Sequence, residues 1–451
     1  MRVGVIGGGL AGVAAAIALA DAGLDVTLLE RRPHLGGLTT SIQRDGLSFD
    51  NGQHVFLGCC TAYQAFIERL GATKQVYLQP RLDMPVLTPG GKAGSISRSR
   101  LPAPLHLASS LARYRFLSIK DRLLLGRAVL ALRRLDLSDP SLDLLTFGDW
   151  LRQHGQSQRA IDRLWNLIIQ PTLNVGADQS SLTLAAMVFR VGFLEQSNGA
   201  DVGWSLVPLS TLHGNNALRT LQHAGVEVQL NTSASSVTPI PNGGFSVHTD
   251  GDVLAFDALI VATSPKVAET LGALDGEHHL AEQLGTSPIV NIHLVLDRKV
   301  TSLAMAACLD SPIEFFFDRS EACGLATGQC LVISLSAADR YIGIGTSELV
   351  PLFFEALCEL LPPARGATLV TSVVTREHAA TFRASPGIES LRPSTTTAVP
   401  GLFLAGAWCN TGWPATMEGA VRSGNEAAAK MLSHLSGSDH TDMHNRERAK
   451  T

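Results

Sequence analysis

Short apolar runs separated by amphipathic or glycine-rich segments recur along the chain, and they predict a mixed α/β protein. Residues 3–6 form an apolar run, an alanine-rich helical segment follows and ends at Gly23, and residues 26–29 form a second apolar run. Runs of this length, bounded by turn residues, are typical of strands that are buried on both faces. Residues 256–265 and 401–408 repeat the pattern much later in the chain. We therefore expect one α/β domain that is assembled from separated stretches.

The middle of the chain predicts a second domain of a different kind. It contains long segments with helical patterns, at 101–135 and 151–194, and shorter strand-like segments joined by turns, at 289–297, 313–318 and 330–336. The expected fold class is α/β, a Rossmann-like nucleotide-binding domain with an inserted α+β substrate domain. By residue, the first domain comprises 1–75, 205–285 and 395–433, the second comprises 76–204 and 286–394, and 434–451 form a polar tail that we expect to be disordered.

Composition narrows the class of protein. The 451 residues are 45% apolar and 17% charged, and the net charge of −4 gives no reason to expect a nucleic acid partner. Seven cysteines without a Cys-x-x-Cys motif predict reduced thiols and a cytoplasmic location. The uncharged run 3–20 is long enough for a membrane span or a signal peptide, but its five glycines and the strand break after Ile6 argue against one apolar helix. We expect a protein that is not integral to a membrane.

The first apolar run leads into a glycine motif that favours a bound dinucleotide. Gly7, Gly9 and Gly12 follow the strand and open the helix, and Glu30 lies at the end of the second strand, 18 residues beyond Gly12. Gly7 allows a tight turn, Gly9 lets the backbone approach a pyrophosphate, and Gly12 permits close packing of helix and strand. The helix N-terminus offers free N–H groups to the phosphates, and an acidic residue at this distance can accept hydrogen bonds from an adenosine ribose.

Three further motifs favour a flavin over a nicotinamide. The segment ERRPHLGG, at 30–37, ends in two glycines, where a second loop can approach the cofactor. The segment FDNGQHVFLG, at 49–58, is a strand interrupted by Gly52, where the backbone can lie against a flat ring. The segment 402–429 begins a helix near Thr416, and such a helix end can stabilise negative charge that develops on a flavin.

Together these residues make the chain resemble the FAD-dependent amine oxidase and phytoene desaturase superfamily over nearly its whole length. Within the superfamily, the strings DNGQHVFLG, LWNLIIQPTLN and WPATMEGAVRSG are most similar to the hydroxysqualene dehydroxylases of bacterial squalene and hopanoid synthesis. The resemblance implies FAD as the cofactor and reductive removal of the allylic hydroxyl of hydroxysqualene, giving squalene and water. It implies a long-chain isoprenoid hydrocarbon as the substrate, and the enzymes of the squalene and hopanoid pathway as possible partners.

The resemblance also implies which residues bind FAD. Glu30 with Arg32 would hold the adenosine ribose, and Val228 would meet the adenine through its backbone. The full set comprises Gly7, Gly9, Leu10, Ala11, Gly12, Glu30, Arg32, Gly36, Gly37, Leu38, Val228, Ala262, Gly406, Ala407, Thr416 and Met417. Members of the superfamily usually have Arg and Asp at two of these positions, where this chain has Leu38 and Ala407. Either loss of a polar partner could weaken FAD binding by about 1–3 kcal/mol.

The implied reaction needs a group that protonates the departing oxygen. His54 is the candidate acid, because it follows Gly52 in the strand expected beside the flavin; a buried, hydrogen-bonded structural histidine is the alternative. Trp165, Asn174 and Trp204 are candidates for the lining of the substrate channel, although core packing would also explain Trp165. No metal site is expected.

Residues 101–135 are apolar and rich in arginine. They could form a surface that lies on the inner face of the membrane and admits a lipid-soluble substrate. A solvated amphipathic helix packed on the domain explains the same pattern equally well.

Two other functions stay open at this point. One is an oxidative relative, a carotenoid or phytoene-type desaturase or an amine oxidase, because the sequence does not set the direction of electron flow. The other is a non-catalytic, flavin-binding partner of a squalene synthase-like enzyme, for which the departures at Leu38 and Ala407 give a motive.

Overall fold

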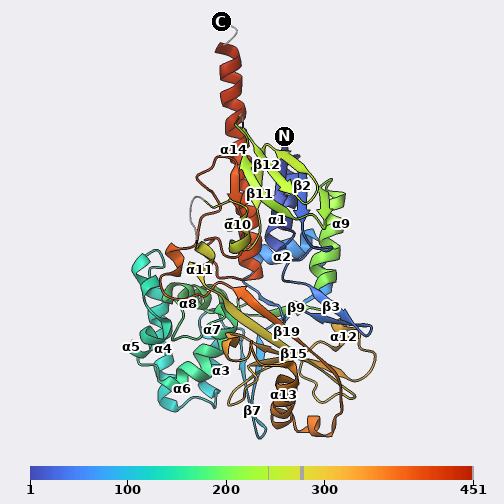
Figure 1. The fold of residues 1–451 in the computed structure, drawn as a ribbon. Coiled ribbons are helices and arrows are strands. Elements are labelled where there is room, and N and C mark those ends of the chain that lie inside the picture. Colours follow the sequence, from blue (N-terminus) through green and yellow to red (C-terminus); the bar gives the residue numbers. More distant parts are fainter. Residues whose placement is uncertain (242, 275–278, 449–451) are drawn as a thin grey trace.

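A computed structural model describes residues 1–241, 243–274 and 279–448. The chain forms two parts that lie one above the other (Figure 1). The upper part contains the N-terminus and a parallel sheet with helices against it, and the lower part contains a long mixed sheet with helices beside it. The C-terminal helix leaves the upper part and extends beyond it (Figure 1).

A five-stranded parallel sheet forms the centre of the upper part. In sheet order its strands are β10 (Glu227–Leu230), β2 (Asp25–Glu30), β1 (Arg2–Ile6), β14 (Ala258–Val261) and β20 (Leu402–Leu404). The helices α1 (Leu10–Asp21) and α14 (Met417–Arg448) pack against each other, with Gly424 directly on the carbonyl group of Ala11. Because the strands come from three separated stretches, the predicted Rossmann-like α/β domain built from discontinuous segments is confirmed.

A seven-stranded mixed sheet forms the centre of the lower part. In sheet order its strands are β19 (Leu369–Thr381), β15 (Ser287–Leu296), β18 (Gln329–Leu335), β17 (Phe315–Asp318), β16 (Met305–Cys308), β7 (Asp83–Thr88) and β8 (Lys92–Ser97). One face packs on α13 (Thr346–Leu360) through residues such as Ile292. The alternate residues of β15 face the upper part, where the His293 ring meets the ring of Phe49. The predicted antiparallel strands are therefore present, and the inserted α+β domain is confirmed.

Helices beside the lower sheet account for the segments with helical patterns (Figure 1). They are α3 (Ala108–Arg113), α4 (Ile119–Arg134), α5 (Phe147–Gln153), α6 (Gln158–Ala160), α7 (Asn166–Leu173) and α8 (Leu182–Phe189). Aromatic side chains hold this group together: the ring of Phe147 lies 5.8 Å from the ring of Trp165 and 5.5 Å from that of Phe189. Such aromatic contacts supply much of the core of a helical unit.

Smaller elements complete the fold. The strands are β3 (Ser41–Arg44) and β4 (Leu47–Asp50), which form a hairpin; β5 (Val55–Leu57), β9 (Val202–Ser205) and β6 (Val76–Leu78), which form one sheet; and β11 (Ala234–Pro239), β12 (Phe245–Thr249) and β13 (Val253–Phe256), which form another. The remaining helices are α2 (Thr61–Arg69), α9 (Asn216–His223), α10 (Pro265–Thr270), α11 (Leu280–Leu284) and α12 (Ser320–Cys323).

The C-terminal segment differs from the prediction. We expected residues 434–451 to be disordered, but α14 continues to Arg448, and residues 449–451 lie outside the described residues. The segment contains no proline, and its first half is already helical because it packs on α1. Extending a nucleated helix costs far less than starting one, so polar composition alone was a poor guide to its end.

None of the helices in the described part of the chain has both the length and the apolar character that crossing a bilayer requires.

Candidate active site

The turn between β1 and α1 is shaped by its glycines. Gly7 has a φ of +110°, and an added side-chain carbon there would collide with the carbonyl group of Ala262. Gly12 lies against the carbonyl group of Gly7, whereas the space beside Gly9 is open to 3.9 Å. Gly9 is the N-cap of α1 and brings no side-chain cap, and the N–H groups of residues 10–12 make no hydrogen bond to another described residue. A helix N-terminus with free N–H groups and an open approach fits a pyrophosphate.

A second glycine loop lies directly against this turn. The N–H of Gly36 donates a hydrogen bond to the carbonyl oxygen of Gly8, at 2.8 Å. An added side-chain carbon at Gly37 would come within 3.0 Å of the Cα atom of Gly9. The two loops therefore form a single wall, in which Gly37 leaves no room for a larger residue.

Glu30 lies buried at the end of β2 and connects the two loops. One carboxylate oxygen accepts a hydrogen bond from the N–H of Gly8, at 2.6 Å, and the other accepts one from the N–H of Arg32, at 2.8 Å. The guanidinium group of Arg32 donates to the carbonyl oxygen of Gly37, at 3.0 Å. Glu30 and Arg32 are thus brought together, as the proposed ribose contact requires.

The other predicted cofactor residues reach the same edge of the sheet from distant positions. Val228 pairs with Leu28 in the register of β10 and β2, and Ala262 follows the end of β14. Gly406 follows β20 with a φ of +152°, and its N–H donates to the hydroxyl oxygen of Ser423 on α14, at 2.8 Å. Ala262 and Gly406 therefore lie at the edge where the glycine loops are, because the loops that follow parallel strands share one edge of a sheet, and a dinucleotide crevice is expected there. Val228 lies within β10, two residues before its end.

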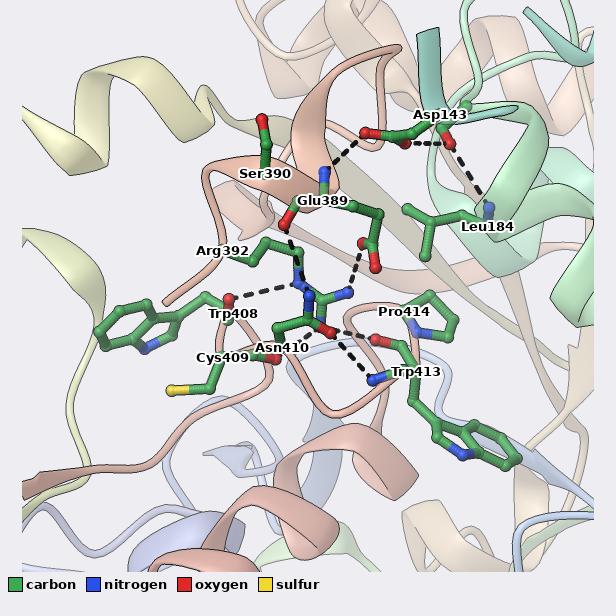
Figure 2. A network of polar contacts seen from close by, with 12 residues as sticks. Asp143, Leu184, Glu389, Ser390, Arg392, Trp408, Cys409, Asn410, Trp413 and Pro414 are labelled. Atoms are coloured by element: carbon green, nitrogen blue, oxygen red, sulfur yellow. Dashed lines mark hydrogen bonds and ion pairs between the residues drawn. The ribbon is translucent and has the colours of Figure 1, made fainter. Parts of the chain in front are cut away.

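Arg392 fixes the loop that leads from β20 to α14 (Figure 2). Its side chain is fully buried, and it donates hydrogen bonds to the carbonyl oxygens of Cys409, at 2.5 Å, and Trp413, at 2.7 Å. It also forms an ion pair with Glu389, at 2.7 Å. The N–H of Glu389 in turn donates to the carboxylate of Asp143, at 2.9 Å, which connects this loop to the helices of the lower part (Figure 2).

The first turn of α14 makes contacts that the sequence did not predict. The hydroxyl oxygen of Thr416 accepts a hydrogen bond from the N–H of Gly419, at 3.1 Å, and so caps the helix. Glu418 is buried and faces α2, where its carboxylate accepts hydrogen bonds from the N–H groups of Ala62, at 3.1 Å, and Tyr63, at 2.7 Å. Glu418 therefore caps the N-terminus of a neighbouring helix.

A group of polar side chains lies below the glycine loops, between β4, β5 and β15. Asp50 and Arg319 form a buried ion pair, at 2.9 Å, and Asp50 also accepts a hydrogen bond from the N–H of Leu209, at 2.9 Å. These contacts give Asp50 a structural role. His54 is half-buried and keeps some accessible surface.

Burial lowers the pKa of His54, and the positive charge of Arg319 acts in the same direction against the attraction of Asp50. Two neighbouring histidines are affected in the same way, since burial lowers the pKa of His213 to about 3 and that of His293 to about 4. At neutral pH His54 is therefore an uncharged imidazole that can donate one hydrogen bond.

The three residues proposed for the substrate channel lie in different surroundings. Trp165 is buried in the aromatic core of the helices, and its ring N–H donates to the side chain of Gln156, at 3.1 Å. Asn174 is occupied by structural hydrogen bonds, among them one from its amide to the carbonyl oxygen of Ser287, at 2.9 Å. Core packing and backbone bonding account for both. Trp204 keeps some accessible surface and pairs with Val55, one residue from His54.

A family model for flavin-containing amine oxidoreductases matches residues 10–432. The chain belongs to this family. The protein is accordingly an FAD-dependent oxidoreductase, as predicted, and the alternative of a non-catalytic flavin-binding partner is set aside.

Proteins similar to this flavin-containing amine oxidoreductase are named for different activities. The hydroxysqualene dehydroxylase of Rhodopseudomonas palustris is 28% identical, with 95% of this chain and 98% of that protein covered. A probable zeta-carotene desaturase of Synechococcus elongatus is 26% identical, with 96% of this chain and 98% of that protein covered. Cyclohexylamine oxidase from Brevibacterium oxydans has a similar fold, with a TM-score of 0.71 at 18% identity, over 96% of this chain and 99% of that chain.

Sequence reasoning missed several residues that shape the site of this flavin-containing amine oxidoreductase. Arg392, Arg319 and Asn291 lie outside every motif. The partners of two of them are remote in sequence: Asn291 contacts residue 53, and Arg319 contacts Asp50.

Proposed function

We propose that this oxidoreductase removes the allylic hydroxyl group of hydroxysqualene and releases squalene and water. The proposal rests on one observation. On the face of the seven-stranded sheet that lies below the glycine loops, polar residues at one end give way to aromatic residues at the other in a gradient of polarity. Directly opposed residues on paired strands project to the same face. Two such rows cross the sheet, one through Asn291, Ser334 and Phe315 and the other through His293, Val332 and Phe317.

The gradient suits a hydrocarbon that carries one oxygen atom. The β15 end of each row is polar, and the β17 end is aromatic, with the rings of Phe315 and Phe317 stacked 6.3 Å apart. Beyond them Met305 and Ala307 extend the apolar face. An aromatic and apolar surface binds isoprenoid units and keeps water away, while the polar end receives the hydroxyl group.

The chemistry divides between the cofactor and the chain. Reduced FAD, when bound, supplies a hydride to the allylic carbon. Gly7, Gly12 and Gly37 would hold the dinucleotide, and the loop fixed by Arg392 would lie on its other side. His54 would give a proton to the oxygen as the carbon–oxygen bond breaks. The similarity to hydroxysqualene dehydroxylase at 28% identity supports this assignment.

Membrane contact through α4 would explain how so apolar a substrate arrives. Ile119 and Leu123 are about three-quarters exposed, at 75% and 77%, and Leu130 is 52% exposed. Lys120 and Arg127 are exposed on the same helix. Apolar side chains beside basic ones are typical of a surface that rests on anionic lipid. We therefore propose peripheral binding to the inner face of the membrane through residues 101–135.

A carotene desaturase is the second candidate, because zeta-carotene desaturases match the chain over similar lengths. The two functions differ in the direction of electron flow, so one experiment separates them. Anaerobic incubation of the reduced enzyme with hydroxysqualene, followed by extraction and hydrocarbon analysis, should yield squalene. A second incubation, of the oxidised enzyme with zeta-carotene and a quinone, should leave the carotene unchanged. A longer conjugated product there, with no squalene in the first incubation, would reject the proposal.

A further inference from the structure

We infer that Asn291, together with His54, forms the site that recognises the oxygen atom of the substrate. The inference rests on the proposed function and adds the residues that distinguish an alcohol from a plain hydrocarbon. Two observations support it: the amide nitrogen of Asn291 has no hydrogen-bond partner among the described residues, and Gly52 beside it has no side chain.

The amide of Asn291 is buried, and its orientation is fixed by one hydrogen bond. The N–H of Gln53 donates to the side-chain oxygen of Asn291, at 3.3 Å, so the amide nitrogen must point the other way. That nitrogen is buried and has no hydrogen-bond partner among the described residues. Buried donors nearly always have a partner, so an unpartnered one beside a cofactor crevice indicates a ligand.

Gly52 lies beside the amide, and its lack of a side chain leaves room there for one further carbon atom. A side-chain carbon on residue 52 would stand 3.4 Å from the amide nitrogen of Asn291 and 3.3 Å from the Nε2 atom of His54. Both nitrogen atoms therefore border the same small volume. Any larger residue at position 52 would occupy it.

The neighbouring strand holds this arrangement in place. Thr375 on β19 pairs with Asn291 in the sheet register, and its hydroxyl group donates to the carbonyl oxygen of Asn51, at 3.1 Å. The loop that carries Gly52 and His54 is therefore attached to the sheet on both sides of Gly52, by Thr375 at Asn51 and by Asn291 at Gln53. Two donors held by separate backbone contacts need little rearrangement when they bind an oxygen atom.

The pair matches the needs of a hydroxyl group that leaves as water. A hydroxyl oxygen has two lone pairs, and the amide N–H of Asn291 and the ring N–H of His54 can each donate to one of them. Reduced FAD, when bound, would supply the hydride for the new carbon–hydrogen bond as the carbon–oxygen bond breaks, and the oxygen would leave with the electron pair of that bond. His54, uncharged at rest, would take up a proton from solvent and pass it to this oxygen, while Asn291 can only donate a hydrogen bond. The products are the hydrocarbon and one water molecule.

The test compares the binding of the alcohol with that of the hydrocarbon. Hydroxysqualene and squalene are titrated separately into the oxidised holoenzyme, with the flavin spectrum as the readout, and squalene formation is measured with the reduced enzyme. The wild type should bind the alcohol more tightly than squalene. Asn291→Leu should bind the alcohol at least tenfold more weakly, with squalene binding unchanged or tighter, and should form squalene at least tenfold more slowly. His54→Ala should also form squalene slowly while its flavin absorbance stays intact.

The controls separate this inference from a general defect and from the proposed function. Thr183→Val removes a hydroxyl group that is also buried and has no partner among the described residues, far from β15 in the sequence, and should change neither measurement. If Asn291→Leu does not retain flavin, Asn291→Asp replaces it, because this variant keeps the acceptor for Gln53 but loses the donor; it should also lose the preference for the alcohol. A variant that keeps both the preference and the rate would overturn the role of Asn291. A wild type that forms no squalene would instead reject the proposed function.

Discussion

The N–H of Gly36 donates a hydrogen bond to the carbonyl oxygen of Gly8 and so joins the two glycine loops that meet at the cofactor crevice. Neither loop can move away from the other without breaking this contact. The wall that they form depends on this backbone contact and on the side chains of Glu30 and Arg32, which bond to Gly8 and Gly37. The effect of the contact between the loops on cofactor binding can be tested at Gly37, the residue next to Gly36.

Gly37→Ala should weaken FAD binding by tenfold or more, because the added methyl group would approach the Cα atom of Gly9 to 3.0 Å and push the loops apart. Gly23→Ala is the matched control: Gly23 also has a positive φ, of +83°, but no atom lies within 4 Å of the added carbon. The control should lose about 1 kcal/mol of stability and keep its flavin. Flavin absorbance after gel filtration measures flavin retention in the two variants. Equal flavin retention in the two variants would show that the contact between the loops does not matter.

The sequence predicted the part of the site that is local and missed the part that is assembled by the fold. The turn with Gly7, Gly9 and Gly12 could be recognised because its glycines, its helix and Glu30 lie within one stretch of chain. Asn291 could not, because its role depends on the register of β15 with its neighbours and on a loop 238 residues away. The hairpin of β7 and β8, which turns at Gly90 and Gly91, carried a signal that was not used.

The C-terminal helix shows a different limit. Polar composition suggested disorder, whereas the outcome depends on how firmly the first half of α14 is packed on α1. Trp165 shows a third limit of the sequence, because an aromatic residue at helical spacing gives no indication whether it lines a channel or fills a core. In this protein Trp165 lies in the core.

Arg392→Met should destabilise the protein by about 3–5 kcal/mol, because it leaves Glu389 and the carbonyl groups of the loop without their buried partner. Flavin should be lost as well, since the same loop lies beside the crevice. Arg69→Met breaks an exposed ion pair with Asp21 and should cost less than about 1 kcal/mol. Denaturant unfolding of the two variants gives the comparison. A similar loss of stability in both would contradict the role given to Arg392.

Stability should fall as the pH drops below about 6.5. His213 and His293 have their pKa values lowered to about 3 and about 4 in the folded protein, against 6.5 for the unfolded chain. Above pH 6.5 both histidines are uncharged in the folded protein and in the unfolded chain, so their titration takes nothing from the stability there. Below it the unfolded chain binds protons that the folded protein does not, and each histidine then costs about 1.4 kcal/mol per pH unit.

Denaturant unfolding at pH 7, 6 and 5 measures this slope. The His293→Gln variant should show a smaller slope than the wild type, by about one proton. Stability that stays constant or rises from pH 7 to pH 5 would contradict the burial of these two histidines.

The double variant Ile119→Gln, Leu123→Gln should bind vesicles at least tenfold more weakly than the wild type, because each side chain would lose the gain from entering the lipid, about 1.5–3 kcal/mol. Both residues are so exposed that the fold should not change. Flotation with phosphatidylglycerol-containing vesicles measures the bound fraction, and pure phosphatidylcholine should bind less of the wild type. Val253→Gln, which alters an exposed apolar residue on β13, serves as the control. Equal flotation of all three proteins would leave α4 as an ordinary solvated helix.

The central claim is that electrons leave the reduced flavin for the substrate. Rapid mixing of the reduced holoenzyme with hydroxysqualene, without oxygen, tests it most directly through the flavin absorbance. We predict that the oxidised spectrum returns, with one squalene formed for each flavin oxidised. A flavin that stays reduced in the presence of hydroxysqualene would contradict the account.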